Sequence, residues 1–393
     1  MRRAKNHARR QRGVRRLIAS FALGGALLLG LGFALGRQTA PQPRPHAAAK
    51  VAVRRAPVKR RHAARPAPAV PRAIDAPIQA SLKARLSAQH FSGTGIVIKH
   101  GRLVASVSMG LASVKRHLAN REDTLYEIDS LQKSLTSGLV MQLLDAGKLT
   151  LTTPIGNYYP QFKQDPQLTV GALMRMQSGL RATASLVPHY RSDAQLVNAV
   201  ASRLTFQRQY FGTWAYTPAN YVLLAGIVEK ITGRSYEALF KAAYPQRLHL
   251  THTVMAYALK PGMNYASGYV LQGSQLYAQQ QFTSLDQMHA ELGTGQVYMS
   301  ALDFYQAVRS LVRGRLLGAS RDQVYHPGEH YCGGFYQDVP GFMRANGSGY
   351  GYISTMQLAR DGQAAVILLG NVQGHRRADI IQVADQMRRE FLQ

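Results

Sequence analysis

Two stretches of the chain, after residue 75 and near residue 390, space their apolar residues as amphipathic helices do. After Asp75, which can cap a helix, Ile78, Leu82 and Leu86 recur at intervals of three to four residues. The same kind of spacing relates Ile380, Ile381, Ala384, Met387 and Phe391. Both patterns predict helices that bury one face, and the second is suited to cover a sheet.

Apolar runs on either side of glycine turns predict two antiparallel hairpins. The first turns at His100-Gly101, between residues 93 and 104, and the second turns at Asp361-Gly362, between residues 352 and 369. Mostly helical patterns lie between the two hairpins. We therefore expect an α/β fold of the α+β type, with an antiparallel sheet flanked by the terminal helices and a mostly helical insertion. About 320 residues are enough to bury such a core as one unit.

One apolar helical run opens with a serine and a lysine three residues apart. Ser130 and Lys133 precede Leu135 and Leu139 in this run, and Ser130 begins the chain's one Ser-x-x-Lys. Residues three apart share a helix face, with Cβ atoms roughly 5–6 Å apart, so the hydroxyl and the amine can touch. Burial favours a neutral amine, and a neutral amine can take the hydroxyl proton. The pair is a candidate nucleophile and base, although such spacing also arises by chance.

Acyl transfer needs two further kinds of group, a second proton carrier and hydrogen-bond donors for the oxyanion. Tyr216 is a candidate proton carrier because a phenol can relay a proton; alternatively it packs beside Trp214. The candidate oxyanion donors are the backbone N–H groups of Ser130 and Ser348. Gly347, which precedes Ser348, would let a substrate backbone approach closely, although a simple bulge or turn would also explain it.

Seven short blocks are spread in order along the chain from Phe91 onward. They are Gly93-Thr94-Gly95, Asp123-Thr124-Leu125-Tyr126 leading to Ser130, Asp145-Ala146-Gly147-Lys148-Leu149, Gln177-Ser178-Gly179-Leu180, Tyr216-Thr217-Pro218-Ala219-Asn220, Asn346-Gly347-Ser348 and Gly370-Asn371. This series resembles the serine β-lactamase-like and penicillin-binding-protein superfamily, and most of all its branch of class C β-lactamases, esterases and D-Ala carboxypeptidases. The resemblance implies a β-lactamase/transpeptidase-like fold in which Ser130, Lys133 and Tyr216 are catalytic.

The second motif of that family is altered here. The family's Tyr-x-Asn reads Tyr216-Thr217-Pro218, and proline has no side-chain amide that could bond the lysine or a substrate carbonyl. Asn220 is a candidate substrate contact in its place; alternatively it packs against or caps the following helix.

The third motif is altered as well. Where the family has Lys-Thr-Gly or His-x-Gly, this chain has Ala345-Asn346-Gly347, so the cation that normally helps to bind a substrate carboxylate is missing. Arg344 is adjacent, but strand alternation points it to the other face. Asn346, Gly347 and Ser348 remain the expected substrate strand. Weaker carboxylate recognition favours an ester, or an amide without a strict free carboxylate, over efficient β-lactam hydrolysis.

Other kinds of site are not indicated. His326 and His330 are four residues apart, but Pro327 and Gly328 break the helix that would bring them together. The single cysteine, Cys332, excludes an internal disulfide and is expected to be a small packed residue. We therefore expect neither a metal nor a cofactor.

The first 74 residues have a different composition, with 18 of the 48 Lys and Arg and neither Asp nor Glu. Residues 17–36 are uncharged, and at about 1.5 Å per residue they span roughly 30 Å, the thickness of a membrane core. The basic residues of segment 1–16 predict that this end stays in the cytoplasm, so that 17–36 forms a single-pass transmembrane anchor in the cell membrane and the rest is extracytoplasmic. A cleaved signal peptide, with an exit at Ala34-Leu35-Gly36, is the alternative.

Residues 37–74 are rich in Pro, Ala and basic residues and have no apolar period, which predicts a disordered linker. Its charge suits anionic cell-wall polymers or lipid head groups, although a solvated spacer would have the same composition. Nucleic acid is not an expected partner, because it would require the opposite topology. The hydrolase domain is then predicted over residues 75–393.

These observations predict a membrane-anchored serine acyl-hydrolase or acyl-transferase that works through an acyl-enzyme. The resemblance implies cell-wall substrates, either D-alanyl peptides of peptidoglycan or D-alanyl esters on teichoic acid. Two alternatives stay open. One is a catalytically weak cell-wall or β-lactam binding or sensing module of the same fold, and the other is a polyanion-binding adhesion protein that depends on its basic linker.

Overall fold

The computed structural model describes residues 70–326, 328–374 and 377–393. The predicted segments 1–16 and 17–36, and most of the predicted linker, lie outside these residues. Within the described ranges, no helix is both long enough and apolar enough to cross a membrane.

The end of the predicted linker belongs to the folded domain. Val70 is buried, and the backbone of residues 71–75 pairs with the edge of the sheet: Leu103 N donates to Pro71 O at 2.8 Å, and Ala73 N donates to Leu103 O at 2.9 Å. The prediction of a linker up to residue 74 is therefore wrong for its last five residues. Amino-acid composition gives no sign of this pairing, because the hydrogen bonds join backbone groups, which every residue has.

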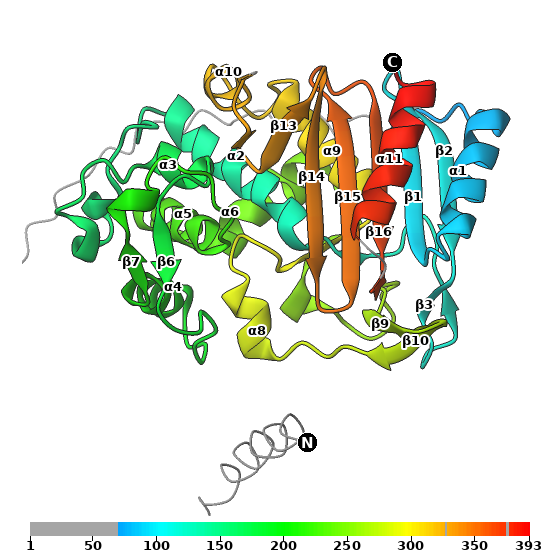
Figure 1. The fold of residues 1–393 in the computed structure, drawn as a ribbon, viewed down its shortest axis with the longest axis horizontal. Helices are drawn as coiled ribbons and strands as arrows, with labels where there is room; N and C mark the ends of the chain where they lie inside the picture. The colour runs from blue at the N-terminus through cyan, green and yellow to red at the C-terminus, as the bar shows by residue number, and fades with distance from the viewer. Residues whose placement is uncertain (1–69, 327, 375–376) are drawn as a thin grey trace, which may run out of the picture. The chain divides into compact units, whose positions relative to one another are not determined.

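A seven-stranded antiparallel sheet forms the centre of the domain (Figure 1). Its strands, in spatial order, are β12 (Tyr331–Cys332), β13 (Phe335–Val339), β14 (Phe342–Gly349), β15 (Tyr352–Ala359), β16 (Ala365–Gly370), β1 (Gly93–Lys99) and β2 (Arg102–Met109). Both predicted hairpins are confirmed as β1–β2 and β15–β16. The sequence did not predict strands β12 and β13, because they are short and only Gly333 and Gly334 lie between them.

The two terminal helices cover one face of this sheet, as Figure 1 shows. They are α1 (Ala76–Ala88), which Asp75 caps by accepting a hydrogen bond from Ile78 N, and α11 (Arg377–Phe391). Leu82, Leu86 and Met387 pack there against sheet residues such as Val97 and Leu368. The prediction of two terminal helices that flank an antiparallel sheet is thus confirmed.

The opposite face packs on α2 (Gln132–Asp145) and α9 (Ala301–Val312). Beyond them lies a mostly helical region, as predicted. Its helices are α3 (Val170–Met174), α4 (Asp193–Ser202), α5 (Ala219–Thr232), α6 (Tyr236–Ala243) and α7 (Pro245–Leu248). Two further helices are α8 (Leu285–Ala290) and α10 (Ser320–Val324), and short 3-10 turns include η1 (Asp129–Leu131).

Short strands outside the main sheet complete the fold. They are β3 (Leu111–Ser113), β4 (Leu118–Ala119), β5 (Tyr126–Glu127), β6 (Leu180–Ala182), β7 (Leu204–Phe206), β8 (Thr253–Met255), β9 (Tyr269–Gln272), β10 (Gln275–Gln280), β11 (Val297–Met299) and β17 (Val372–Gln373). The small sheet β5-β11-β8 matters most for the site, because β5 leads directly into Ser130.

Candidate active site

Ser130 lies in the short 3-10 turn η1, between strand β5 and helix α2. The strand is fixed by its pairing with β11, and Ile128 N donates to Val297 O at 3.0 Å. Asp129 has a positive φ of 46°, a backbone conformation that few residues other than glycine adopt. This bend turns the chain sharply from strand to helix and places Ser130 at the entrance of α2.

Ser130, Lys133 and Tyr216 meet in space. Lys133 Nζ lies 2.8 Å from Ser130 Oγ, and the Tyr216 hydroxyl donates to the same oxygen at 2.7 Å. Lys133 Nζ also lies 5.3 Å from the centre of the Tyr216 ring. Lys133 is completely buried, whereas 37% of Tyr216 is exposed. The serine oxygen is therefore contacted by one buried and one solvent-facing proton carrier.

Beyond Ser130 and Tyr216, Lys133 contacts backbone groups. Its Nζ donates to the carbonyl oxygen of Thr294 at 3.4 Å. Behind the lysine, Gly334 in the β12–β13 turn packs against α2; a Cβ at Gly334 would lie 2.7 Å from the Lys133 carbonyl carbon, and φ there is +87°. The one sign of this support in the sequence is the Gly333-Gly334 pair, which allows a close approach of backbone.

Strand β14 runs close to the turn that carries Ser130. A Cβ at Gly347 would lie 2.7 Å from Ile128 O and 2.9 Å from Asp129 Cβ, so only glycine allows the two segments to meet. Strand β13 pairs with β14 only from Phe342 to Arg344. The end of β14 that carries Ser348 therefore has β15 on one side and η1 near the other. Ser348 therefore lies on an unpaired stretch of strand edge near the turn that carries Ser130.

The polar side chains of the substrate strand turn away from Ser130. Ser348 Oγ accepts from Gln373 at 2.9 Å, and Asn346 contacts Thr355 on β15 at 2.8 Å. Arg344 lies over the Tyr336 ring and forms an ion pair with Asp338 at 2.6 Å. Strand alternation does point Arg344 away from the Ala345 side.

Asn220 does not reach the cleft. Its side chain is fully buried, where it accepts a hydrogen bond from Ser178 at 2.8 Å and donates to Met176. The idea that Asn220 replaces the missing motif asparagine as a substrate contact is therefore wrong. The alternative, that it packs within its helix region, describes the structure, because its position on α5 faces the core.

A buried carboxyl group lies on β5, the strand that leads into Ser130. Glu127 is almost completely buried on β5, and Tyr298 donates to it at 3.3 Å. Burial, reinforced by the nearby charge of Glu291, raises the pKa of Glu127 to about 8. The Glu127 side chain is thus largely protonated at neutral pH.

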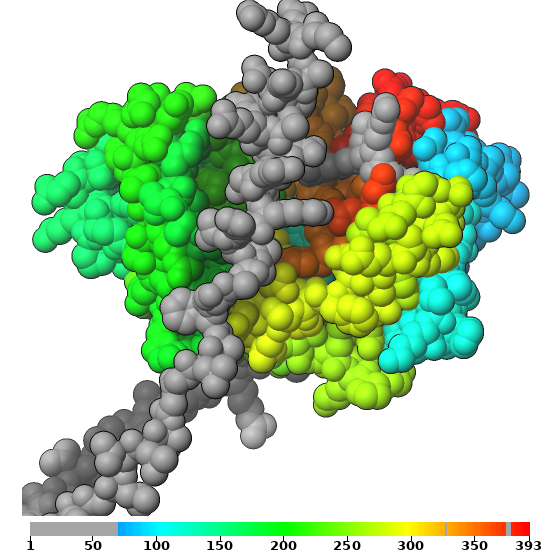
Figure 2. Space-filling view, turned by 60° about the horizontal axis from the view of Figure 1, so that its bottom comes forward, coloured from blue at the N-terminus to red at the C-terminus, as the bar shows by residue number. Residues whose placement is uncertain are grey.

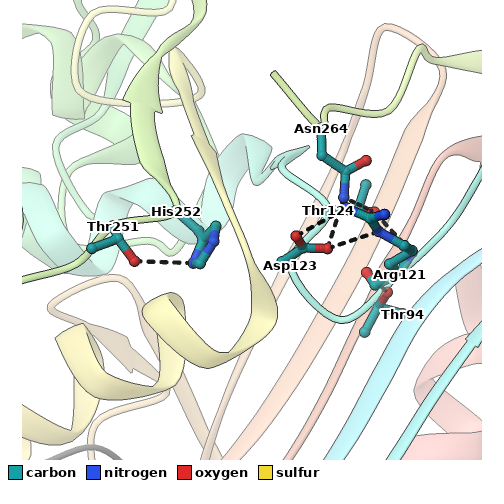
Figure 3. A network of polar contacts seen from close by, with 7 residues as sticks. All are labelled: Thr94, Arg121, Asp123, Thr124, Thr251, His252 and Asn264. Atoms are coloured by element: carbon teal, nitrogen blue, oxygen red, sulfur yellow. Dashed lines mark hydrogen bonds and ion pairs between the residues drawn. The ribbon is translucent and has the colours of Figure 1, made fainter. Parts of the chain in front are cut away.

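A cavity of about 540 Å³ lies elsewhere, lined in part by Arg121, Asp123 and His252. Figure 3 shows its polar network: Arg121 contacts Asp123 at 3.2 Å, and Asn264 donates to the same carboxylate at 2.8 Å. Burial raises the pKa of Asp123, but the hydrogen bonds and charge of Arg121 and the bond from Asn264 more than reverse this, so the net pKa is lowered. Arg121 is paired with Asp123 and Arg72 with Glu122, and Ser130 does not line this cavity.

No group of three or more His, Cys, Asp or Glu residues suited to a metal occurs in the described part of the chain. The ring of His330 packs edge-on against Trp214, with centroids 5.0 Å apart. Cys332 is buried, and burial raises the pKa of its thiol to about 12. This cysteine therefore matches the expected packed residue.

A model of the family described as Beta-lactamase matches residues 78–386 of this chain. The chain belongs to the beta-lactamase family. Two similar curated proteins are a putative penicillin-binding protein, PbpX, of Bacillus subtilis strain 168 and a teichoic acid D-alanine hydrolase of Staphylococcus aureus. The first is 27% identical over 73% of this chain and 72% of its own length, and the second is 27% identical over 78% and 75%.

Solved structures show the same fold. The crystal structure of FmtA from Staphylococcus aureus is similar with a TM-score of 0.70 and 24% identity, over 84% of this chain and 91% of that one. The crystal structure of a D-amino acid amidase from Ochrobactrum anthropi SV3 is similar with a TM-score of 0.65 and 18% identity. The match covers 80% of this chain and 99% of the amidase chain. The predicted resemblance to the serine β-lactamase-like superfamily is confirmed. The protein is a serine hydrolase of the beta-lactamase family.

Proposed function

We propose that this serine hydrolase removes D-alanyl groups from cell-wall esters through an acyl-enzyme on Ser130. The observation that carries the proposal is the convergence of Lys133 and Tyr216 on Ser130 Oγ, at 2.8 and 2.7 Å. Such an arrangement activates a hydroxyl without histidine or metal. The name of the S. aureus relative, a teichoic acid D-alanine hydrolase, supports the choice of substrate.

In the first half-reaction, neutral Lys133 takes the proton from Ser130 as Oγ bonds to the ester carbonyl carbon. The carbonyl electron pair moves onto oxygen, and the resulting oxyanion is stabilised by the amide N–H groups of Ser130 and Ser348. When the intermediate collapses, the carbon–oxygen bond to the alcohol breaks. The leaving oxygen takes a proton from Tyr216, which recovers one from the ammonium of Lys133.

In the second half-reaction, water replaces the alcohol. Lys133, again neutral, accepts a proton from the water through Tyr216 while the water oxygen bonds to the acyl carbon. The bond between that carbon and Ser130 Oγ then breaks, Oγ takes a proton from the ammonium of Lys133, and D-alanine leaves. An acceptor hydroxyl in place of water would make the same steps a transfer.

The altered strand favours an ester over a D-Ala-D-Ala peptide. The family's cation position is occupied by Ala345, which is buried, and the adjacent Arg344 is held by Asp338. A substrate with a free carboxylate therefore finds no cation at the usual place. An ester of D-alanine has no such carboxylate to bind.

We also propose that residues 17–36 anchor the protein in the cell membrane, with the hydrolase domain outside, and that the basic residues beyond them contact anionic cell-wall polymers. This proposal rests on charge and hydropathy of the sequence alone.

The test is intact-mass analysis of the purified full chain after reaction with a penicillin-type probe and, separately, with an activated D-alanyl ester. An adduct that forms on the natural protein and is absent in Ser130→Ala supports the proposed nucleophile. Release of the adduct within the assay supports a hydrolase. A stable adduct without turnover would instead support the binding or sensing module of the same fold.

The choice of ester is tested by turnover. We expect higher kcat/KM for a D-alanyl ester than for a D-Ala-D-Ala peptide of similar size. Equal or faster turnover of the peptide would overturn the preference for esters while leaving the role of Ser130 intact.

A further inference from the structure

The turn of residues 291–296, here called the lysine bracket, follows α8 and supports α2 at two neighbouring positions. The Thr294 carbonyl accepts from Lys133 Nζ at 3.4 Å, and the Gly293 carbonyl accepts from the Thr136 hydroxyl at 2.7 Å. Lys133 and Thr136 are three residues apart and share a helix face. Two consecutive carbonyls of the bracket therefore meet the face of α2 that carries the lysine.

The bracket is fixed by the side chain and backbone of Glu291. The Thr294 hydroxyl donates to Glu291 Oε2 at 2.5 Å, and the backbone N–H groups of Thr294 and Gly295 donate to the Glu291 carbonyl at 2.8 and 3.1 Å. Gln296 accepts from Gly293 N at 3.0 Å and closes the other end. Thr294 is buried, so water does not compete strongly for these bonds.

The other oxygen of the same carboxylate reaches the substrate strand. Tyr350, in the turn between β14 and β15, donates to Glu291 Oε1 at 3.3 Å. Figure 2 shows orange atoms of this part of the sheet in a recess beside the yellow part of the chain. Glu291 thus links the carbonyl that holds Lys133 to the end of the strand that carries Ser348.

We propose that Glu291 and Thr294 are positioning residues for Lys133, and that they take over the orienting role of the asparagine missing from the second motif. The inference rests on the proposed function, in which Lys133 is the base. Pro218 stands where the family has the asparagine, and Asn220 is turned into the core, so neither presents an amide to the lysine. A backbone carbonyl on a carboxylate-anchored turn supplies the acceptor instead.

The physical reason is the freedom of the lysine side chain. An unheld lysine samples several rotamers, and misplacing a catalytic atom by about 1 Å can cost about 100-fold in rate. The carbonyl of Thr294 restricts Nζ to the side of Ser130. The hydroxyl of Thr294 acts one step further away, because it keeps that carbonyl in place by bonding Glu291.

The test compares Thr294→Val with Thr294→Ser in the full chain. Valine keeps the shape of threonine but removes the hydroxyl, whereas serine keeps the donor to Glu291. We expect Thr294→Val to lower kcat for an activated D-alanyl ester about tenfold with KM changed less than about twofold, because the interaction acts on the transition state. Thr294→Ser should recover most of that loss. Glu291→Gln should fall between the two, since an amide can accept from only one of the two hydroxyls.

Thr94→Val is the matched control. Thr94 is another fully buried threonine whose hydroxyl bonds Tyr126 at 2.9 Å and Ser108 at 2.9 Å, away from Lys133. It should lower the melting temperature to a similar extent while leaving kcat of the folded protein unchanged. An equal loss of kcat in Thr94→Val would assign the effect to general destabilisation and overturn the proposal.

The two proposals fail in different ways. Natural kcat in Thr294→Val, or no recovery in Thr294→Ser, overturns the positioning role even where Ser130→Ala abolishes the adduct. An adduct that persists in Ser130→Ala overturns the proposed function itself, whatever Thr294→Val does.

Discussion

The Tyr216 hydroxyl lies 2.7 Å from Ser130 Oγ although 86 residues separate the two in the chain. The tyrosine is carried by the segment before α5, whereas the serine is carried by the turn before α2. Their contact joins the helical region to the entrance of the central helix. It also distinguishes Tyr216 from a residue that merely packs beside Trp214.

We expect Tyr216→Phe to slow acylation of Ser130 about 100-fold, because removal of a positioned proton carrier typically costs 10²–10⁴-fold. The ring stays in place, and a partly exposed hydroxyl contributes little to folding. The measurement is the rate of adduct formation by intact mass, together with the melting temperature. Unchanged acylation in a folded Tyr216→Phe protein would remove the tyrosine from the mechanism.

Lys133→Met should abolish detectable turnover while the protein stays folded. Methionine fills a similar volume in a site that is completely buried, and it cannot take a proton from Ser130. Lys133→Arg should fail equally, because a guanidinium does not become neutral near physiological pH. The check is kcat for an activated ester beside circular dichroism. Turnover within about tenfold of natural in either variant would contradict the role of a neutral amine.

Glu127 predicts a specific dependence of stability on pH. Its pKa is raised from 4.5 in the unfolded chain to about 8 in the folded protein. Below about pH 4.5, Glu127 is protonated in both the folded and the unfolded protein. Between about pH 4.5 and pH 8, it is protonated in the folded protein and ionised in the unfolded chain. The contribution of Glu127 to the free energy of unfolding is therefore greatest at low pH and falls as pH rises towards 8.

Glutamine resembles the protonated form of Glu127 and does not ionise. The Glu127→Gln variant should therefore lack the decrease in the free energy of unfolding that Glu127 causes as pH rises. Denaturant unfolding of the variant and of the natural protein between pH 5 and 8 measures the difference, which should grow in favour of the variant as pH rises. Glu390→Gln, at a partly exposed carboxylate, serves as the control and should leave the slope unchanged. Parallel curves for Glu127→Gln and the natural protein would contradict the raised pKa.

Gly347→Ala should lower both stability and acylation. The added Cβ would lie 2.4 Å from Ser354 Oγ and 2.7 Å from Ile128 O, so strand β14 and the turn that carries Ser130 must separate. Adding Ser354→Ala should recover little, because the Ile128 carbonyl belongs to the backbone and cannot rotate away. Melting temperature and adduct formation are the readouts. Natural values of both would show that the two segments do not meet as described.

Much of the fold was predictable because its signals are local. Asp75 and the apolar stripe after it determined α1, and the turn at His100-Gly101 determined the β1–β2 hairpin. The contact between Ser130 and Lys133 also follows from local geometry, since residues three apart on a helix are neighbours. Tyr216 could be placed at the site only through the resemblance to a family.

The residues that surround Lys133 were not predictable in the same way. The contact of Thr294 with Lys133 uses a backbone carbonyl, which every residue has, so no side-chain pattern marks it. Gly334 and Glu291 act through close approach and through hydrogen bonds across the fold. The strands β12 and β13 are too short for their period to stand out.

By itself the sequence determined the contact between Ser130 and Lys133, the terminal helices, the main hairpins and the changes in two family motifs, because each depends on neighbouring residues. Only the tertiary structure decided that Asn220 is buried and that residues 70–74 join the domain. It also decided that the Thr294 carbonyl contacts Lys133 and that the Thr294 hydroxyl bonds Glu291. Those facts depend on which distant segments pack together. Which segments pack together depends on residues from the whole core, so it cannot be predicted from any single stretch of the chain.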